Sequence, residues 1–352
     1  MNFHGGDIYN LNRELLDFSS NINPLGVPLS YRKALIDNID DFIKYPDIKY
    51  TELRKSIAKY LGIENIDYIV PGNGAVEIIY KVVDALKIRE VIIAAPTFSE
   101  YRRAAYVKGL CYEEIEVYNE KGSLMLDKFF TKLKSNSLYV ICNPNNPTGT
   151  LTNVEKLSSF AKQLYELDSY LLVDEAFIEF TDEYPNNSTV SKLYEHPNVI
   201  VVRAATKFFG MPGIRLGYGI SFNEDLISAM KNRLEPWNIN TSGVIAECIF
   251  RDQDYISRSR EWISKERGWL YNELKGIRGL STYPTSANFF LIKILKDNFD
   301  GEKFKEMMIK KDILIRTSEG FTHLSPFHIR VAIKNRKSNE RLILALKDCV
   351  DI

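Results

Sequence analysis

Between residues 50 and 220, the chain alternates short apolar runs with longer stretches of helical periodicity. Apolar residues recur at helical spacing in residues 51–62 and 153–167, which predicts amphipathic helices. Runs rich in β-branched and other apolar residues predict strands that are buried on both faces. These predicted strands span residues 90–96, 137–144, 170–177 and 199–206. Because helical stretches separate them, we expect right-handed crossovers and a mainly parallel sheet.

Polar and glycine-rich residues stand where the predicted strands end. Asp174 ends one apolar run, Lys207 follows another, and the turn-forming segment 143–149 follows a third. The carboxyl ends of parallel strands meet at one edge of a sheet, and ligands bind beyond that edge. We therefore expect these residues to gather in one site.

The pattern changes from about residue 251. A long, charged helical stretch leads to short apolar runs around a further helix, which predicts a smaller α+β domain. We expect the N-terminal segment to join that domain. The predicted division is a large domain of residues 31–250 and a small domain of residues 1–30 and 251–352.

Composition and charge exclude several classes of function. The 352 residues contain 46 Lys+Arg and 46 Asp+Glu, so no net charge favours nucleic acid or an anionic membrane. No apolar run approaches the ~18 residues of a membrane span, and the first residues lack the pattern of a signal peptide. The four cysteines lie far apart without a CxxC, which argues against a metal site or a disulfide framework. We expect a soluble cytoplasmic protein.

Segment 203–220 raises the clearest chemical question. Lys207 stands among apolar and aromatic residues, and Arg215 follows it with glycines between. A buried lysine costs stability unless it is paired or neutral. A lysine whose pKa is lowered by an apolar setting is also a nucleophile.

Glycines at positions 72 and 74 separate a predicted strand from a predicted helix. Such a turn exposes the backbone N–H groups of Gly74, Ala75 and Val76 at a helix N-terminus, where phosphate binds readily. Glycine turns before helices are common, so the turn alone is a weak signal. Asp174 alone would equally suit a helix cap or a salt bridge.

Taken in order, the motifs carry more information than any one of them. A glycine turn is followed by "APTFSEY", "NPNNPTG", "VDEAF" and "TKFFGMPGIRLGY". The series resembles the fold-type I enzymes that use pyridoxal 5'-phosphate (PLP), within the histidinol-phosphate aminotransferase branch. The resemblance implies an α/β fold with a mainly parallel seven-stranded sheet between helices, and PLP as cofactor.

The resemblance also assigns roles to residues. Lys207 would be the amine that carries the cofactor, and Asp174 would face its pyridine nitrogen. Asn146 matches the residue that binds the ring hydroxyl, and Phe98 matches the aromatic side chain that stacks on the ring. Tyr45 matches a tyrosine that reaches the cofactor of a neighbouring subunit, which implies a homodimer. The cofactor phosphate is assigned to Gly74, Ala75, Val76, Thr206 and Arg215.

The choice of reaction depends on other parts of the chain. Aminotransferases of this branch typically have the motif DEAY, whereas this chain reads DEAF and has Phe177 in place of the tyrosine. The difference reflects either neutral drift or a different reaction. The segments "HGG" at residues 4–6 and "LLDFSSNINPLGVP" at residues 15–28 resemble the L-threonine-O-3-phosphate decarboxylases of cobalamin biosynthesis. So do several segments after residue 234.

This second resemblance implies decarboxylation of O-phospho-L-threonine to (R)-1-aminopropan-2-yl phosphate. Arg330, aided by Asn146, would bind the substrate carboxylate. The substrate phosphate is assigned to His4, Gly5, Asn21 and Arg316. Seen alone, these arginines would be surface residues, and histidinol-phosphate aminotransfer to 2-oxoglutarate remains the alternative reaction. A non-catalytic protein of this fold would be expected to lack some motif residues, yet Lys207, Asp174 and Arg215 are all present.

Overall fold

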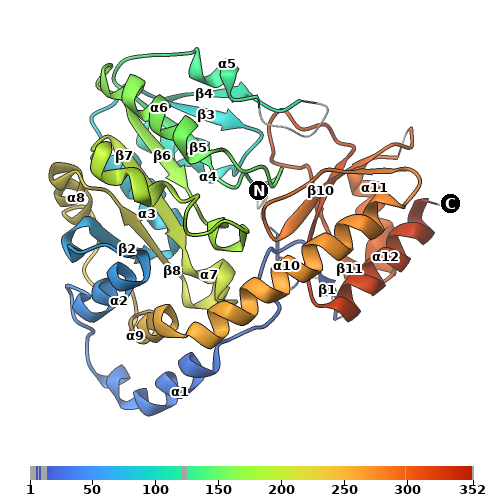
Figure 1. Ribbon diagram of the computed structural model, residues 1–352, viewed down its shortest axis with the longest axis horizontal. Coiled ribbons are helices and arrows are strands. Elements are labelled where there is room, and N and C mark those ends of the chain that lie inside the picture. Colours follow the sequence, from blue (N-terminus) through green and yellow to red (C-terminus); the bar gives the residue numbers. More distant parts are fainter. Residues whose placement is uncertain (1–4, 7, 9–13, 120–124, 298, 351–352) are drawn as a thin grey trace.

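A seven-stranded sheet forms the centre of the larger part of the molecule (Figure 1). The computed structural model describes residues 5–6, 8, 14–119, 125–297 and 299–350. The strand order is β2-β8-β7-β6-β5-β3-β4, and β8 runs in the direction opposite to the other six strands of this described sheet. The strands are β2 (Ile69–Asn73), β3 (Glu90–Ala95), β4 (Cys111–Glu116), β5 (Ser137–Cys142), β6 (Tyr170–Asp174), β7 (Val199–Ala204) and β8 (Leu216–Ile220). The predicted mainly parallel sheet is confirmed.

Alternate residues of the central strands are buried on opposite faces of the sheet. In β3, Val91 and Ile93 belong to a hydrophobic cluster with α3, α4 and α8. Ile92 and Ala94 belong to a second cluster, with α2 and α6. Because both faces are covered, these strands read as continuous apolar runs.

Local signals account for the ends of the helices. Helix α2 ends at Gly62, which has a left-handed φ of 70°. Helix α6 begins after Asn153, whose side chain accepts a hydrogen bond from the backbone N–H of Glu155. The helices of this part are α1 (Leu29–Asp37), α2 (Thr51–Leu61), α3 (Gly74–Ala85), α4 (Glu100–Lys108), α5 (Asp127–Phe130), α6 (Val154–Tyr165), α7 (Ala205–Phe208), α8 (Glu224–Lys231) and α9 (Thr241–Ile245). Across the described ranges, no helix combines the length and apolar character needed to cross a membrane.

A second, four-stranded antiparallel sheet lies in the C-terminal part, in the order β12-β13-β10-β9. Helix α10 (Gln253–Lys275) runs from the region of the large sheet to this smaller one (Figure 1). The short strand β1 (Leu16–Asp17) pairs with β11 (Ile313–Leu314), so the N-terminal segment lies beside the C-terminal part. The remaining elements are β9 (Leu280–Thr282), β10 (Phe289–Ile294), α11 (Gly301–Lys310), β12 (Arg316–Thr317), β13 (His328–Ala332) and α12 (Arg336–Val350). The exact domain boundaries stay a prediction.

Candidate active site

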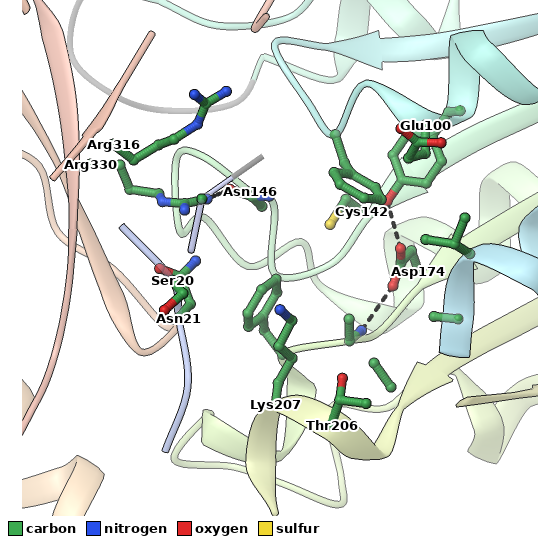
Figure 2. Close-up of a pocket in the computed structure, with 18 of the residues that line it drawn as sticks. Ser20, Asn21, Glu100, Cys142, Asn146, Asp174, Thr206, Lys207, Arg316 and Arg330 are labelled. Carbon is green, nitrogen blue, oxygen red and sulfur yellow. Dashed lines mark hydrogen bonds between the residues drawn. The ribbon is translucent and has the colours of Figure 1, made fainter. Parts of the chain in front are cut away.

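A cavity of about 440 Å³ opens beyond the carboxyl ends of β5, β6 and β7. Cys142, Asp174 and Ala204, the last residues of these three strands, line it. The chain leaves the sheet at this edge, so side chains from separate segments converge there (Figure 2). Its other wall comes from the N-terminal segment and the small sheet, through residues such as Ser20 and Arg330.

Lys207 stands on the short helix α7, which follows β7 directly. In the view of Figure 2 it lies between Asp174 on one side and Asn21 and Arg330 on the other. Burial, together with the charges of Arg330 and Arg215, lowers the pKa of its amine to about 8, although Asp174 opposes the shift. A larger share of the amine is therefore neutral, and nucleophilic, than for an exposed lysine.

Asp174 is buried at the end of β6. Its Oδ1 accepts a 2.9 Å hydrogen bond from the backbone N–H of Ala176, and its Oδ2 accepts a 2.7 Å bond from the hydroxyl of Tyr101. Burial raises the pKa of this carboxyl to about 6, while the two hydrogen bonds act to lower it. A buried carboxylate of this kind can pair with a protonated ring nitrogen.

An anion cradle lies at the N-terminus of α3. Gly74 opens this helix with a φ of 78°, and a Cβ there would lie 2.5 Å from a guanidinium nitrogen of Arg215. A Cβ on Gly217 would lie 2.2 Å from the backbone nitrogen of Ala75, so β8 contacts this turn directly. Ala75, Val76, Thr206 and Arg215 all line the cavity. Helix-end amides, a hydroxyl and a guanidinium suit a phosphate group.

The opposite end of the cavity carries two buried arginines on neighbouring strands. Arg316 and Arg330 are paired across β12 and β13. Burial, with the nearby charge of Arg316, lowers the pKa of Arg330 to about 9. Arg330 donates to Oδ1 of Asn146 and to the backbone oxygen of Ser19, but its Nε has no partner among the described residues. Two adjacent buried cations favour an anionic ligand at this end.

The structure brings most of the predicted site residues into this one cavity. Those that line it are Gly5, Asn21, Ala75, Val76, Phe98, Asn146, Asp174, Thr206, Lys207, Arg215, Arg316 and Arg330. Gly74 lies against Arg215 behind the cradle. Tyr45 does not line the cavity: it is 78% exposed and its ring stacks on Trp237 at 4.4 Å. His4 lies outside the described residues.

Several lining residues were not predicted, among them the aromatic residues Tyr101 and Phe321. The signal for Tyr101 is its place in "APTFSEY", three positions after Phe98: Phe98 lies just before α4 and Tyr101 lies in its first turn. Phe321 stands in a loop after β12. The guanidinium carbon of Arg316 lies over its ring, 5.3 Å from the ring centroid. No local pattern marks that residue.

The arrangement fits PLP: an amine, a buried carboxylate and an anion cradle suit its aldehyde, its pyridine nitrogen and its phosphate. Comparisons with known proteins agree with this fit. The sequence profile of the family described as "Aminotransferase class I and II" matches residues 13–346.

Individual relatives cover nearly the whole chain. A protein of Caldanaerobacter subterraneus subsp. tengcongensis named "Putative threonine-phosphate decarboxylase" is 38% identical over 98% of this chain and 93% of its own length. The threonine-phosphate decarboxylase of Salmonella typhimurium is 32% identical over 95% of this chain and 91% of its own length. The crystal structure of the histidinol-phosphate aminotransferase from Clostridium acetobutylicum, 37% identical, superimposes with a TM-score of 0.90 over 96% of this chain and all of that one. The chain therefore belongs to the class I and II aminotransferase family and is a PLP-dependent enzyme.

Proposed function

We propose that this enzyme decarboxylates O-phospho-L-threonine to (R)-1-aminopropan-2-yl phosphate, for cobalamin biosynthesis. The observation that carries the proposal is the pair of buried arginines, Arg316 and Arg330, facing the cavity that holds Lys207. A substrate with a carboxylate and a phosphate supplies one anion for each guanidinium. The threonine-phosphate decarboxylase relatives give independent support.

In this proposal, each anionic end of the substrate has its own set of partners. Arg330 and Asn146 bind the carboxylate, since Nε of Arg330 has no partner among the described residues and leaves a donor for it. Arg316, Gly5 and Asn21 bind the phosphate, with His4 as a further partner. The amide nitrogen of Asn21 is a donor that phosphate oxygens can accept from, and its Oδ1 is buried with no hydrogen-bond partner among the described residues.

We assign the cofactor roles to residues that line the same cavity or its cradle. Bound PLP supplies an electron sink for the bond that breaks at the substrate Cα. Lys207 carries the cofactor, and Asp174 accepts a hydrogen bond from its pyridine nitrogen. Asn146 binds the ring hydroxyl and Phe98 stacks on the ring. The phosphate is held by Gly74, Ala75, Val76, Thr206 and Arg215.

The reaction branch depends on which Cα bond stands perpendicular to the cofactor ring. Arg330 fixes the direction of the carboxylate, and so the orientation of the Cα–COO⁻ bond. After CO₂ leaves, the amine of Lys207 delivers a proton to Cα. Its lowered pKa suits this task, because the amine can both hold and release a proton near neutral pH.

Aminotransfer from histidinol phosphate to 2-oxoglutarate is the second candidate reaction. A histidinol-phosphate aminotransferase of Brevibacillus brevis is 31% identical over 96% of this chain, and the Clostridium acetobutylicum structure noted above bears the same name. Phe177 favours the decarboxylase: it lines the cavity without a hydroxyl and packs on Phe289 at 5.1 Å between ring centroids.

The proposal includes the assembly of the enzyme and its place in the cell. We expect a homodimer in which Tyr45 reaches the neighbouring cofactor, closed by a small domain of residues 1–30 and 251–352. We also expect a cytoplasmic enzyme, because all four cysteines are free, as in a reducing compartment.

Incubating the purified holoenzyme with O-phospho-L-threonine tests the reaction. We expect release of CO₂ and of the amine phosphate, with the visible absorbance of the bound cofactor kept during turnover. Formation of a 2-oxo acid together with the pyridoxamine form of the cofactor would instead establish aminotransfer. Histidinol phosphate with 2-oxoglutarate is the matched comparison, and we expect little product from it.

A further inference from the structure

Tyr101 holds the carboxylate of Asp174 from within the wall of the cavity. It stands in the first turn of α4 and is 1% exposed. Its hydroxyl donates to Oδ2 of Asp174 at 2.7 Å, while the N–H of Ala176 donates to Oδ1 at 2.9 Å. Both bonds are drawn as dashed lines at Asp174 in Figure 2. Two donors on two different oxygens fix the plane of the carboxylate.

The chemistry of the pair sets the direction of this hydrogen bond. Burial, with the nearby charge of Asp174, holds the pKa of the Tyr101 hydroxyl well above its ordinary value, so the phenol keeps its proton. It therefore donates. An ionised carboxylate has about four acceptor positions. Tyr101 and Ala176 use one each, which leaves acceptor capacity for a donor in the cavity.

Other titratable groups around Asp174 do not replace this contact. Burial raises the pKa of the Cys142 thiol, which stays neutral. The charge of Glu175 acts to raise the pKa of Asp174, and that of Lys207 acts to lower it. Burial has the largest effect, and the hydrogen bond from Tyr101 opposes it most strongly.

The ring of Tyr101 makes a second contact that bears on the site. It meets the ring of Phe98 edge to face, with centroids 5.7 Å apart and planes at 82°. Phe98 is the residue expected to stack on the cofactor. One side chain thus contacts two groups that would face the same pyridine ring.

We propose that Tyr101 is a positioning residue that keeps the Asp174 carboxylate oriented and available to the protonated pyridine nitrogen of PLP, and that sets the tilt of Phe98. The inference rests on the proposed role of Asp174. It does not depend on which Cα bond the enzyme breaks.

Retention of the cofactor as a function of pH tests the inference without any measurement of turnover. Full-length holoenzyme is gel-filtered at a series of pH values, and the PLP that stays bound is measured. Loss of the Tyr101 hydroxyl removes a donor that favours the ionised carboxylate, so the pKa of Asp174 rises. In Tyr101→Phe we expect the pH midpoint of retention to move up by about one unit, so that the ratio of bound to released PLP at the wild-type midpoint is about ten-fold lower.

Tyr139→Phe is the matched control, since Tyr139 is a buried, hydrogen-bonded tyrosine whose hydroxyl contacts Lys132 and Lys134 away from the cavity. Its retention midpoint should equal that of the wild type. Tyr101→Met, which also lacks the hydroxyl, provides the same reading if Tyr101→Phe does not fold.

Asp174→Asn shows whether the inference about Tyr101 fails by itself or together with the proposed pairing of Asp174 with the pyridine nitrogen. If Asp174→Asn loses PLP while Tyr101→Phe keeps the wild-type midpoint, the inference about Tyr101 is overturned. An equal shift in Tyr139→Phe overturns it as well. If Asp174→Asn retains PLP like the wild type, the proposed role of Asp174 fails too.

Discussion

At the scale of single residues, the site consists of ionisable groups held away from water. Burial lowers the pKa of Lys207 and of Arg330 and raises that of Asp174. Each group is thus shifted toward its neutral form. A bound ligand that supplies the opposite charge relieves this cost, so the same burial that disfavours the unliganded site favours ionic ligands.

A prediction at this scale concerns Lys207→Met. In the cofactor-free protein, this substitution should raise the free energy of unfolding at neutral pH by about 1–3 kcal/mol, because it removes a buried charge. The pKa of Lys207 is about 8 in the folded protein against an ordinary 10.5. The cost of burying the charged amine therefore lowers stability in full below pH 8 or so, and it disappears above about pH 10.5. Urea unfolding at several pH values measures it.

The pH profile of that difference is the stringent part of the prediction. Between the two pKa values the unfolded chain binds more protons than the folded one, so wild-type stability rises with pH there. The advantage of Lys207→Met should shrink across this window. An advantage that stays constant with pH would contradict the account.

At the scale of elements, the phosphate cradle depends on how closely β8 approaches the start of α3. Gly217 pairs with Gly72 in the β2–β8 register, and its Cα faces the turn that begins α3. An added Cβ would meet the backbone at Ala75 and Gly74, at 2.2 and 2.5 Å. Backbone atoms cannot rotate away as a side chain can, so the turn itself would have to move.

Gly217→Ala should therefore lower the affinity for PLP by about ten-fold or more, as overpacking displaces the amides of the cradle. Gly213→Ala is the matched control, because a Cβ at that position meets nothing within 4 Å. Equilibrium titration of the two variants with PLP compares them. Equal affinities for both variants would show that this close approach is unimportant for the cofactor.

At the scale of the whole molecule, the cavity lies between the large sheet and the C-terminal part, so contacts between them shape it. Arg102 of α4 donates to Oγ1 of Thr322 at 2.8 Å and to the backbone oxygen of Gly320 at 3.1 Å. Thr322 in turn donates to Glu114 of β4 at 2.6 Å. These bonds fasten the loop that carries Phe321 over the cavity.

Arg102→Met should loosen this loop and weaken binding of O-phospho-L-threonine by about three- to ten-fold, through the loss of hydrogen bonds to a charged group. Affinity for PLP should not change, because no contact to the cradle is lost. Calorimetric titration measures the first quantity. Arg233→Met, which removes an arginine paired with Asp84 on the surface, should behave like the wild type.

The expected dimer would use the outer surface of the large domain. Large apolar side chains are exposed along α1, the 3₁₀ helix at Ile39–Ile43 and the following loop, which is unusual for a free surface. They are Leu29, Ile36, Ile39, Phe42, Ile43, Tyr45 and Ile48. Such a cluster next to Tyr45 suits an interface between two copies of the chain.

Ile43→Glu should shift the protein from dimer to monomer, because a charge would replace a side chain that is 86% exposed in the single chain. Light scattering after gel filtration gives the mass of each form. Leu344→Glu alters a residue of α12 that is 64% exposed and should leave the dimer intact. A wild-type protein that is monomeric would refute the expected assembly.

The main strands and helices and the edge of the sheet at which ligands bind could be predicted from the sequence, because periodicity and strand-end motifs are local signals. PLP was predicted from the family resemblance that the order of the motifs carries. The contact of Tyr101 with Asp174, the position of Phe321 at the cavity and that of Tyr45 beside Trp237 were seen only in the folded chain. The contact between Arg330 and Asn146 joins residues that are 184 positions apart in the sequence. The topology of the fold brings them together, and no local pattern shows that they meet. Periodicity shows which face of an element is buried, but it does not show which distant side chain meets that face.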